Sequence, residues 1–303
     1  MDFDKLPNYI IIGAGKAGTT SLFDILEQHP QVYTPPKKEL RFFSDDRHYN
    51  EGPQYYEDTY FSKAAGFPAR IEASPAYLTW SEKSAERIKQ LYGDRPVKFI
   101  AIFRDPVKRA YSHYWHRIRL GSEDGSYSFA EAVRHEDERI KEKWDYLFPK
   151  GDGLHGYKRA SHYMQRLQPF LQIFPRENFH FMIQEDLYKD FDLHMAALCR
   201  YMGIDDTFNF HSLNSNESAV PRYDFLGKTY KQMKANPFTK VIFRMFFSKN
   251  ARATLFKDVV MKKFEYPPIE EDIKKELYAE FADETDQLAK LIGRDLSSWK
   301  LKE

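Results

Sequence analysis

Short apolar runs alternate with helical patterns along the first half of the chain, and this alternation is typical of an α/β protein. The run Tyr9-Ile10-Ile11-Ile12 ends at Gly13 and has the uniformly apolar character of a buried parallel strand. Residues 97–103 (VKFIAIF) form the strongest strand candidate, residues 70–73 a weaker one, and residues 179–183 a later one. We therefore expect a central parallel β-sheet.

Helical patterns separate these strands and dominate the second half of the chain. The expected helices cover residues 20–29, 81–92, 157–174 and 192–202, followed by one long closing helix over 269–292. Another helix should begin after residue 104, because Asp105 can cap free N–H groups and Pro106 is tolerated at a first helical position. Residues 203–222 have the pattern of a loop. Since no linker rich in Gly, Ser or Pro is present, we predict a single domain over residues 1–303.

Composition and charge narrow the class of protein. The 303 residues carry 46 Lys and Arg against 45 Asp and Glu, so the net charge of +1 provides no general attraction for nucleic acid. A single cysteine, Cys199, excludes an internal disulfide framework and fits a reducing compartment. No apolar run reaches the ~18 residues that span a bilayer, and the first residues do not resemble a secretion signal. These features predict a cytoplasmic globular protein.

A glycine-rich loop, residues 13–20 (GAGKAGTT), joins the first predicted strand to the first predicted helix. Glycines allow backbone N–H groups to approach an anion closely, and the helix N-terminus adds positive potential. In a Walker A loop the lysine would stand at Thr19, whereas here Lys16 lies inside the loop. The spacing of Gly13, Gly15 and Gly18 also fits a Rossmann fingerprint, but its acidic partner is missing. The loop therefore predicts an anion-binding site.

A second anion site is predicted at the end of the strongest strand. That strand ends in Arg104 rather than in an acid that could hold Mg²⁺, and Asp105 is better used as a helix cap. An arginine beside a phosphate-binding loop favours another anionic group over a metal. Ser112 follows about two helical turns later and could donate its hydroxyl to the same anion. We expect no metal ligands in this site.

Several segments together resemble the sulfotransferases that use 3′-phosphoadenosine 5′-phosphosulfate (PAPS), in particular the heparan sulfate sulfotransferases and related bacterial enzymes. The matching segments are IIGAGKAGTTSL (11–22), HPQVY (29–33), KELRFFSDDRHY (38–49), EASPAYL (72–78), FRDPVKRAYSHY (103–114), SHYMQRLQPFLQIFP (161–175), FHFMIQEDL (179–187) and LIGRDLSSW (291–299). The resemblance implies an α/β fold of the P-loop kinase type, with a central parallel sheet flanked by helices and a helical C-terminal half.

The resemblance also implies roles for individual residues. The 5′-phosphosulfate of PAPS would be held by Lys16, Ala17, Gly18, Thr19 and Thr20, and the 3′-phosphate by Arg104 and Ser112. Lys16 would offset charge that develops on the leaving phosphate, without a metal. Glu39 would be the general base that removes a proton from the acceptor hydroxyl. Its neighbours Lys37, Lys38 and Arg41 should lower the pKa of Glu39.

Two departures from the heparan sulfate branch concern the acceptor. Where those enzymes have the lysine of EKTPAY, this chain has Ala73, which cannot provide a charge to a polyanionic acceptor. Their disulfide-bounded loop is absent, and residues 214–222 take its place, with Arg222 as a candidate nucleotide contact. The predicted acceptor is the hydroxyl, or less favourably the amine, of a small metabolite or a saccharide.

A basic segment, residues 228–263, has apolar residues among its lysines and arginines. Such a segment can lie on an anionic membrane or cover an acidic acceptor, although more often it is a solvated helix face with a buried stripe. Two alternatives to the sulfotransferase follow from the sequence. One is a P-loop kinase that uses ATP and Mg²⁺, and the other is a non-catalytic module that binds a nucleotide or docks on a membrane.

Overall fold

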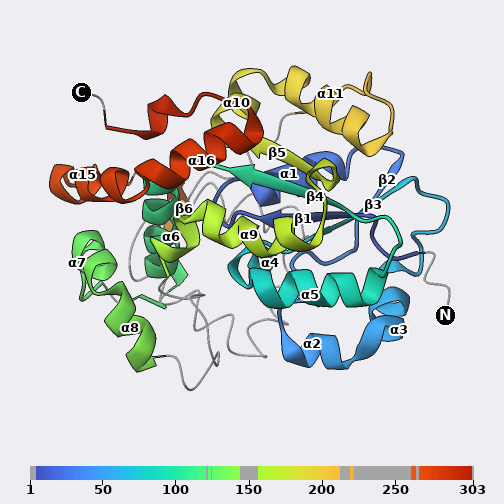
Figure 1. The fold of residues 1–303 in the computed structure, drawn as a ribbon, viewed down its shortest axis with the longest axis horizontal. Helices are drawn as coiled ribbons and strands as arrows, with labels where there is room; N and C mark the ends of the chain where they lie inside the picture. The colour runs from blue at the N-terminus through green and yellow to red at the C-terminus, as the bar shows by residue number, and fades with distance from the viewer. Residues whose placement is uncertain are drawn as a thin grey trace, which may run out of the picture. The chain divides into compact units, whose positions relative to one another are not determined.

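Five parallel strands form the central sheet of the computed structural model, which describes residues 5–120, 122–123, 125–143, 156–211, 219–221, 261–263 and 266–301 (Figure 1). The strands are β1 (Tyr9–Gly13), β2 (Val32–Tyr33), β3 (Ala69–Ala73), β4 (Lys98–Phe103) and β5 (Phe179–Ile183). Their order in the sheet is β2-β3-β1-β4-β5, and every pair of neighbours is parallel. The predicted α/β fold is confirmed.

The strand order explains where the helices lie. From β1 the chain moves outward to β2 and β3, and it then returns past β1 to β4 and β5. Because crossovers between parallel strands are right-handed, this reversal puts α1 (Thr19–Leu26) on one face and α5 (Ser81–Tyr92) with α9 (Tyr163–Ile173) on the other. Helices α5 and α9 lie side by side (Figure 1). The reversal between β1 and β4 creates a switch point, where open α/β sheets bind ligands.

Burial of the strands follows the sequence pattern. All five residues of β1 are buried, and Ile10, Ile11 and Ile12 have no exposed surface. Such a strand needs helices on both faces, which the two crossover directions provide. On the α9 side, the ring of Phe99 stacks on Phe179, with ring centroids 4.9 Å apart. The core is thus centred on β1 and β4, the strands that carry the site residues.

The remaining helices are mostly short. They are α2 (Asp46–Asn50), α3 (Gly52–Tyr56), α4 (Ala76–Thr79), α6 (Pro106–Leu120), α7 (Phe129–Arg134), α8 (Glu136–Lys143), α10 (Gln184–Lys189), α11 (Phe191–Met202), α15 (Glu271–Glu280) and α16 (Ala282–Ile292). Single turns occur at Glu57–Phe61, Arg159–Ser161, Arg176–Asn178 and Ser297–Trp299. Among the residues that the structure describes, no helix is both long and apolar enough to cross a membrane.

Three predicted elements differ from the structure. The helix expected over 157–174 begins only at Tyr163, after the short turn Arg159–Ser161. The long helix expected over 269–292 is two helices, because the chain bends at Phe281 and buries that ring against His162. The loop expected over 203–222 contains a short strand, β6 (Ala219–Pro221), which pairs antiparallel with β7 (Met261–Lys263).

The chain divides into two compact units, residues 1–213 with 269–303, and residues 214–268. The first unit contains the parallel sheet, and the described part of the second contains β6 and β7. A single domain over residues 1–303 stays a prediction.

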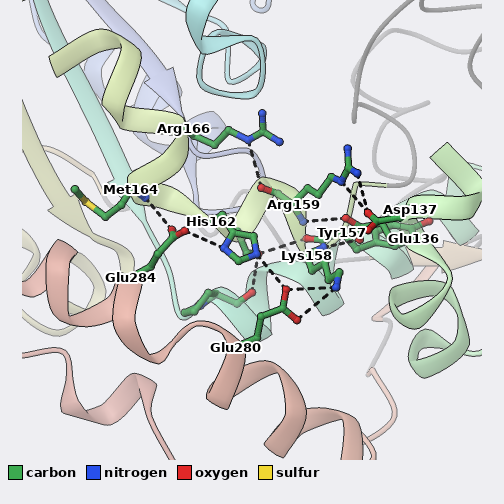
Figure 2. A network of polar contacts seen from close by, with 12 residues as sticks. Glu136, Asp137, Tyr157, Lys158, Arg159, His162, Met164, Arg166, Glu280 and Glu284 are labelled. Atoms are coloured by element: carbon green, nitrogen blue, oxygen red, sulfur yellow. Dashed lines mark hydrogen bonds and ion pairs between the residues drawn. The ribbon is translucent and has the colours of Figure 1, made fainter. Parts of the chain in front are cut away.

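His162 connects the closing helices to the start of α9 (Figure 2). Its two ring nitrogens lie 3.0 Å from a carboxylate oxygen of Glu284 and 3.2 Å from one of Glu280. Two carboxylate partners require a proton on each ring nitrogen. Although burial opposes the charge, these hydrogen bonds raise the pKa of His162 to about 9. The imidazolium therefore holds α15 and α16 against the turn at Arg159–Ser161.

Replacing His162 by Asn should lower Tm by about 2–6 °C at pH 6, equivalent to ~1–2 kcal/mol. Because the pKa of His162 is raised in the folded protein, protonated His162 stabilises the fold. This stabilisation is complete below about pH 6.5 and is lost as the pH rises through 9. The difference in Tm between wild type and variant should therefore shrink as the pH increases to 9. His135→Asn is the control, because its pairing with Glu138 is exposed. A pH-independent difference would contradict the charged clamp.

Candidate functional site

The glycine-rich loop connects β1 to α1 at the switch point of the sheet. Its Ala14 N–H donates to the carbonyl of Ile102 in β4 over 2.8 Å, so the two central strands fix the loop. Gly18 has a φ of 103°, and a Cβ there would come within 3.0 Å of the Gln184 side chain, so the turn requires glycine. Since Gly18 has no side chain to cap α1, the first N–H groups of that helix can receive an anion.

Lys16 lies half-buried in this loop with a left-handed backbone, φ 71°. Burial together with the nearby guanidinium groups lowers the pKa of Lys16 to about 8. The arginines responsible are Arg119, Arg104, Arg109 and Arg117. Such a concentration of positive charge is costly without a ligand and favours a molecule with several negative groups. Of the other loop residues, Ala17 and Thr19 are buried and Thr20 is exposed.

Arg104 follows β4 and neighbours the loop after β1, as the sequence predicts. Its guanidinium forms no hydrogen bond or ion pair with any residue that the structure describes. The adjacent Asp105 is fully used as a cap: one carboxylate oxygen accepts the N–H groups of Val107 and Lys108, and the other accepts the hydroxyl of Tyr278 over 2.7 Å. The predicted cap is confirmed. Ser112 is buried on α6, two turns further along.

Arg109 is a site residue that the sequence reasoning missed. It is 2% exposed, and its guanidinium donates to Ser161 Oγ over 2.7 Å, to the Gly15 carbonyl over 3.3 Å and to the Tyr157 carbonyl. All three acceptors are neutral, so its charge is not cancelled by a contacting carboxylate among the described residues. Arg109 thus fixes the glycine-rich loop and adds positive potential behind it. The available signal was its position between Arg104 and Ser112 in the sequence.

Glu39 lies on the loop between β2 and α2, beside the end of β3. Its N–H donates to the Ala73 carbonyl over 3.0 Å. Its carboxylate, 41% exposed, lies 3.2 Å from Arg41 and 3.5 Å from Lys38. Partial burial opposes ionisation, but the two cations hold the pKa of Glu39 below its ordinary value. The predicted direction of this pKa is confirmed, with Lys38 and Arg41 as the groups in contact.

Side chains of α6 bring the Glu39 loop and the glycine-rich loop into one electrostatic environment. Burial and the charges of Lys16, Arg119 and Arg117 lower the pKa of His116 to about 4, while Glu39 opposes them. The charges of Lys16 and Glu39 therefore both act on His116, which is neutral at physiological pH. His113, on the same helix, is buried, and Arg117 Nε donates to its ring over 3.3 Å.

Some predicted features cannot be compared with the structure. Arg222 lies outside the described residues, as does the basic segment 228–263 except for the backbone of β7. Within the described ranges, no group of three or more His, Cys, Asp or Glu side chains could hold a metal ion. A reaction without metal stays a prediction.

Comparison with known proteins agrees with this geometry. The family model described as a sulfotransferase domain matches residues 6–250. The chain belongs to the sulfotransferase family. A solved sulfotransferase from Alicyclobacillus acidocaldarius has the same fold, with a TM-score of 0.69 and 26% identity, over 97% of this chain and 98% of that one. The chain is therefore an enzyme of the transferase class.

Curated relatives of this sulfotransferase include human heparan sulfate glucosamine 3-O-sulfotransferase 5, 31% identical over 182 residues that cover 58% of this chain and 47% of the relative. Mouse heparan sulfate glucosamine 3-O-sulfotransferase 3B1 is 30% identical over 61% of this chain and 43% of its own length. The membrane-associated sulfotransferase kil1 of Dictyostelium discoideum is 31% identical over 45% of this chain and 29% of its own length. The chain spans about half the length of the curated relatives it matches, or less.

The predicted cytoplasmic location is wrong by this comparison. The relatives of the sulfotransferase include one that is named as membrane-associated. The prediction depended on the first residues and on a single cysteine. A chain that matches only part of longer relatives carries no information about what precedes it, so those features could not decide the compartment.

Proposed function

We propose that this sulfotransferase transfers a sulfuryl group from PAPS to the hydroxyl, or less favourably the amine, of a saccharide or small metabolite. The observation that carries the proposal is the environment of Lys16. Burial and four nearby arginines lower the pKa of Lys16 to about 8. A donor with anionic groups at both ends would offset the repulsion among these cations, with one group at the glycine-rich loop and the other at Arg104. Relatives named for heparan sulfate support a saccharide acceptor.

The residues present fit such a donor. The glycine-rich loop, with Lys16, Ala17, Gly18, Thr19 and Thr20, would hold the 5′-phosphosulfate at the N-terminus of α1. Arg104, which has no partner among the described residues, and the hydroxyl of Ser112 would hold the 3′-phosphate. Because β1 and β4 are neighbours in the sheet, their C-terminal ends can hold the two ends of one nucleotide.

Glu39 would act as the general base. It takes the proton of the acceptor hydroxyl as the acceptor oxygen bonds to sulfur and the bond between sulfur and the 5′-phosphate oxygen breaks. Lys16 offsets the negative charge on that phosphate oxygen, which leaves as part of 3′-phosphoadenosine 5′-phosphate (PAP). The lowered pKa of Glu39 keeps the carboxylate ionised and ready at neutral pH, although it also makes Glu39 a weaker base.

The family match favours this transferase over the two alternatives from the sequence, the kinase and the non-catalytic module. The cap formed by Asp105 is a further argument against the kinase, because it commits the carboxylate nearest to Arg104 to backbone N–H groups and to Tyr278.

Arg104→Ala tests the proposal through the 3′-phosphate. Wild type should bind PAP more tightly than ADP, which lacks that phosphate. The variant should lose about 10- to 100-fold in affinity for PAP, and little for ADP, since a hydrogen bond to a charged group contributes ~1.5–3 kcal/mol. Isothermal titration calorimetry measures all four affinities. Arg200→Ala is the control, because Arg200 lies on α11 and is paired with Asp206. Equal losses for both nucleotides would overturn the assignment of the 3′-phosphate to Arg104.

A further inference from the structure

The segment that carries Glu39 is held in an unfavourable backbone conformation. Glu39 and Arg41 have φ values of 61° and 55°, in the left-handed region that residues with a Cβ avoid. Such a conformation persists only where surrounding contacts determine it. Two hydrogen bonds to residues at the end of β3 determine the conformation here. Glu39 N–H donates to the Ala73 carbonyl over 3.0 Å, and Arg41 N–H donates to Ser74 Oγ over 2.9 Å.

The Ser74 hydroxyl can accept a hydrogen bond from the Arg41 N–H because it donates its own proton to Glu72. Ser74 Oγ donates to a carboxylate oxygen of Glu72 over 2.6 Å. A serine hydroxyl has one proton and two lone pairs, so this bond turns the lone pairs towards the Arg41 N–H. Glu72 and Ser74 have no exposed surface, and water therefore does not replace either bond.

Glu72 is costly to bury, and no cation among the described residues forms an ion pair with it. Burial raises its pKa to about 7, against hydrogen bonds from Ser74 and Tyr77 and the charge of Lys38. Its second carboxylate oxygen has no hydrogen-bond partner among the residues that the structure describes. The surrounding titratable groups are Lys38, Glu39, Tyr56, Tyr77 and Tyr92. Because burying Glu72 is costly and Glu72 is linked through Ser74 to the segment that carries Glu39, we look for its role in holding that segment.

We infer that Ser74 and Glu72 are positioning residues for the base: Glu72 orients the Ser74 hydroxyl, and that hydroxyl fixes the left-handed turn at residues 39–41 that aims the Glu39 carboxylate. The inference rests on the proposed role of Glu39. It assigns a function to the second and fourth positions of the segment 71–74, where residue 73 itself contributes only a backbone carbonyl.

Ser74→Ala is the first test. The variant removes the acceptor for Arg41 N–H and should lower kcat about 10- to 100-fold, because small misplacements of a reacting group have effects of this size. The affinity for PAP should change less than about 2-fold, since the hydrogen-bond partners of the Ser74 hydroxyl are Arg41 and Glu72 and not residues of the glycine-rich loop. Ser74→Thr keeps the hydroxyl and should recover most of the activity. Ser84→Ala is the matched control, because Ser84 is equally buried and its hydroxyl has no hydrogen-bond partner in the described part of the chain.

A double-variant cycle separates positioning from a merely structural role. If Ser74 acts through Glu39, Ser74→Ala should have almost no further effect on kcat in the Glu39→Gln background. A second readout needs no acceptor: the Glu39 carboxyl, followed by ¹³C NMR, should titrate closer to its ordinary pKa in Ser74→Ala, as the contacts with Lys38 and Arg41 loosen.

The outcomes distinguish the inference from the proposed function. If Glu39→Gln retains full activity, the role of Glu39 as base is wrong. If Glu39→Gln is inactive but Ser74→Ala keeps wild-type kcat and an unchanged Glu39 titration, the base stands and the positioning role is overturned. Additive losses in the double variant, or no recovery by Ser74→Thr, would also overturn it.

Discussion

The variant Glu39→Gln is expected to lose about 10²–10⁴-fold in kcat, the usual contribution of a general base, while its affinity for PAP stays close to that of wild type. Glutamine keeps the size of the side chain but cannot accept the proton of the acceptor. The measurement is PAP release from PAPS in the presence of a saccharide acceptor, together with calorimetric titration of PAP. Asp58→Asn, on an exposed acid outside the site, is the control.

The pH dependence gives a second view of the same residue. Lys38 and Arg41 hold the pKa of Glu39 below its ordinary value, so the acid limb of the wild-type profile of kcat should lie below the range of an ordinary glutamate. A Glu39→Gln enzyme with substantial turnover, or with an unchanged acid limb, would contradict the role of Glu39.

Lys16→Met is expected to lower kcat about 10²–10³-fold, the range found when one group that stabilises transition-state charge is removed. The effect should exceed the loss in PAP affinity, because the arginines around the site still attract the nucleotide. Lys37→Met is the matched control, since Lys37 is exposed near the Glu39 loop.

The titration of Lys16 extends this prediction. Its pKa of about 8 in the free protein means that Lys16 loses its proton as the pH rises through 8. The affinity of wild type for PAP should therefore decrease above pH 8, and the decrease should be weaker in Lys16→Met. Equal pH dependence of the two proteins would show that Lys16 does not face the nucleotide.

The local structure of the candidate site could largely be predicted from the sequence. The apolar run before Gly13, the lysine inside the glycine-rich loop and the cap at Asp105 each depend on neighbours in the chain, and the structure has them as expected. The sequence also predicted a parallel sheet, but not its strand order β2-β3-β1-β4-β5.

Features that depend on long-range contacts could not be predicted. Arg109 is a site residue because Ser161 and Gly15, 52 and 94 residues away, meet its guanidinium. Phe281, at the break between α15 and α16, packs against His162, which lies 119 residues earlier in the chain. Similarly, the hydrogen bond between Ser74 and Arg41 links two loops that no sequence period relates. Burial of charged groups, which sets the pKa values of Lys16 and Glu72, appears only once the core is assembled.

The most direct test of PAPS-dependent transfer is thermal unfolding of the protein with PAP, with ATP and Mg²⁺, and without ligand. A ligand at 100 times its Kd adds ~2.7 kcal/mol, which should raise Tm by about 5–10 °C for a chain of this size. PAPS-dependent transfer predicts this increase with PAP and little change with ATP and Mg²⁺. An increase with ATP and Mg²⁺ alone, or no increase with either nucleotide, would contradict it.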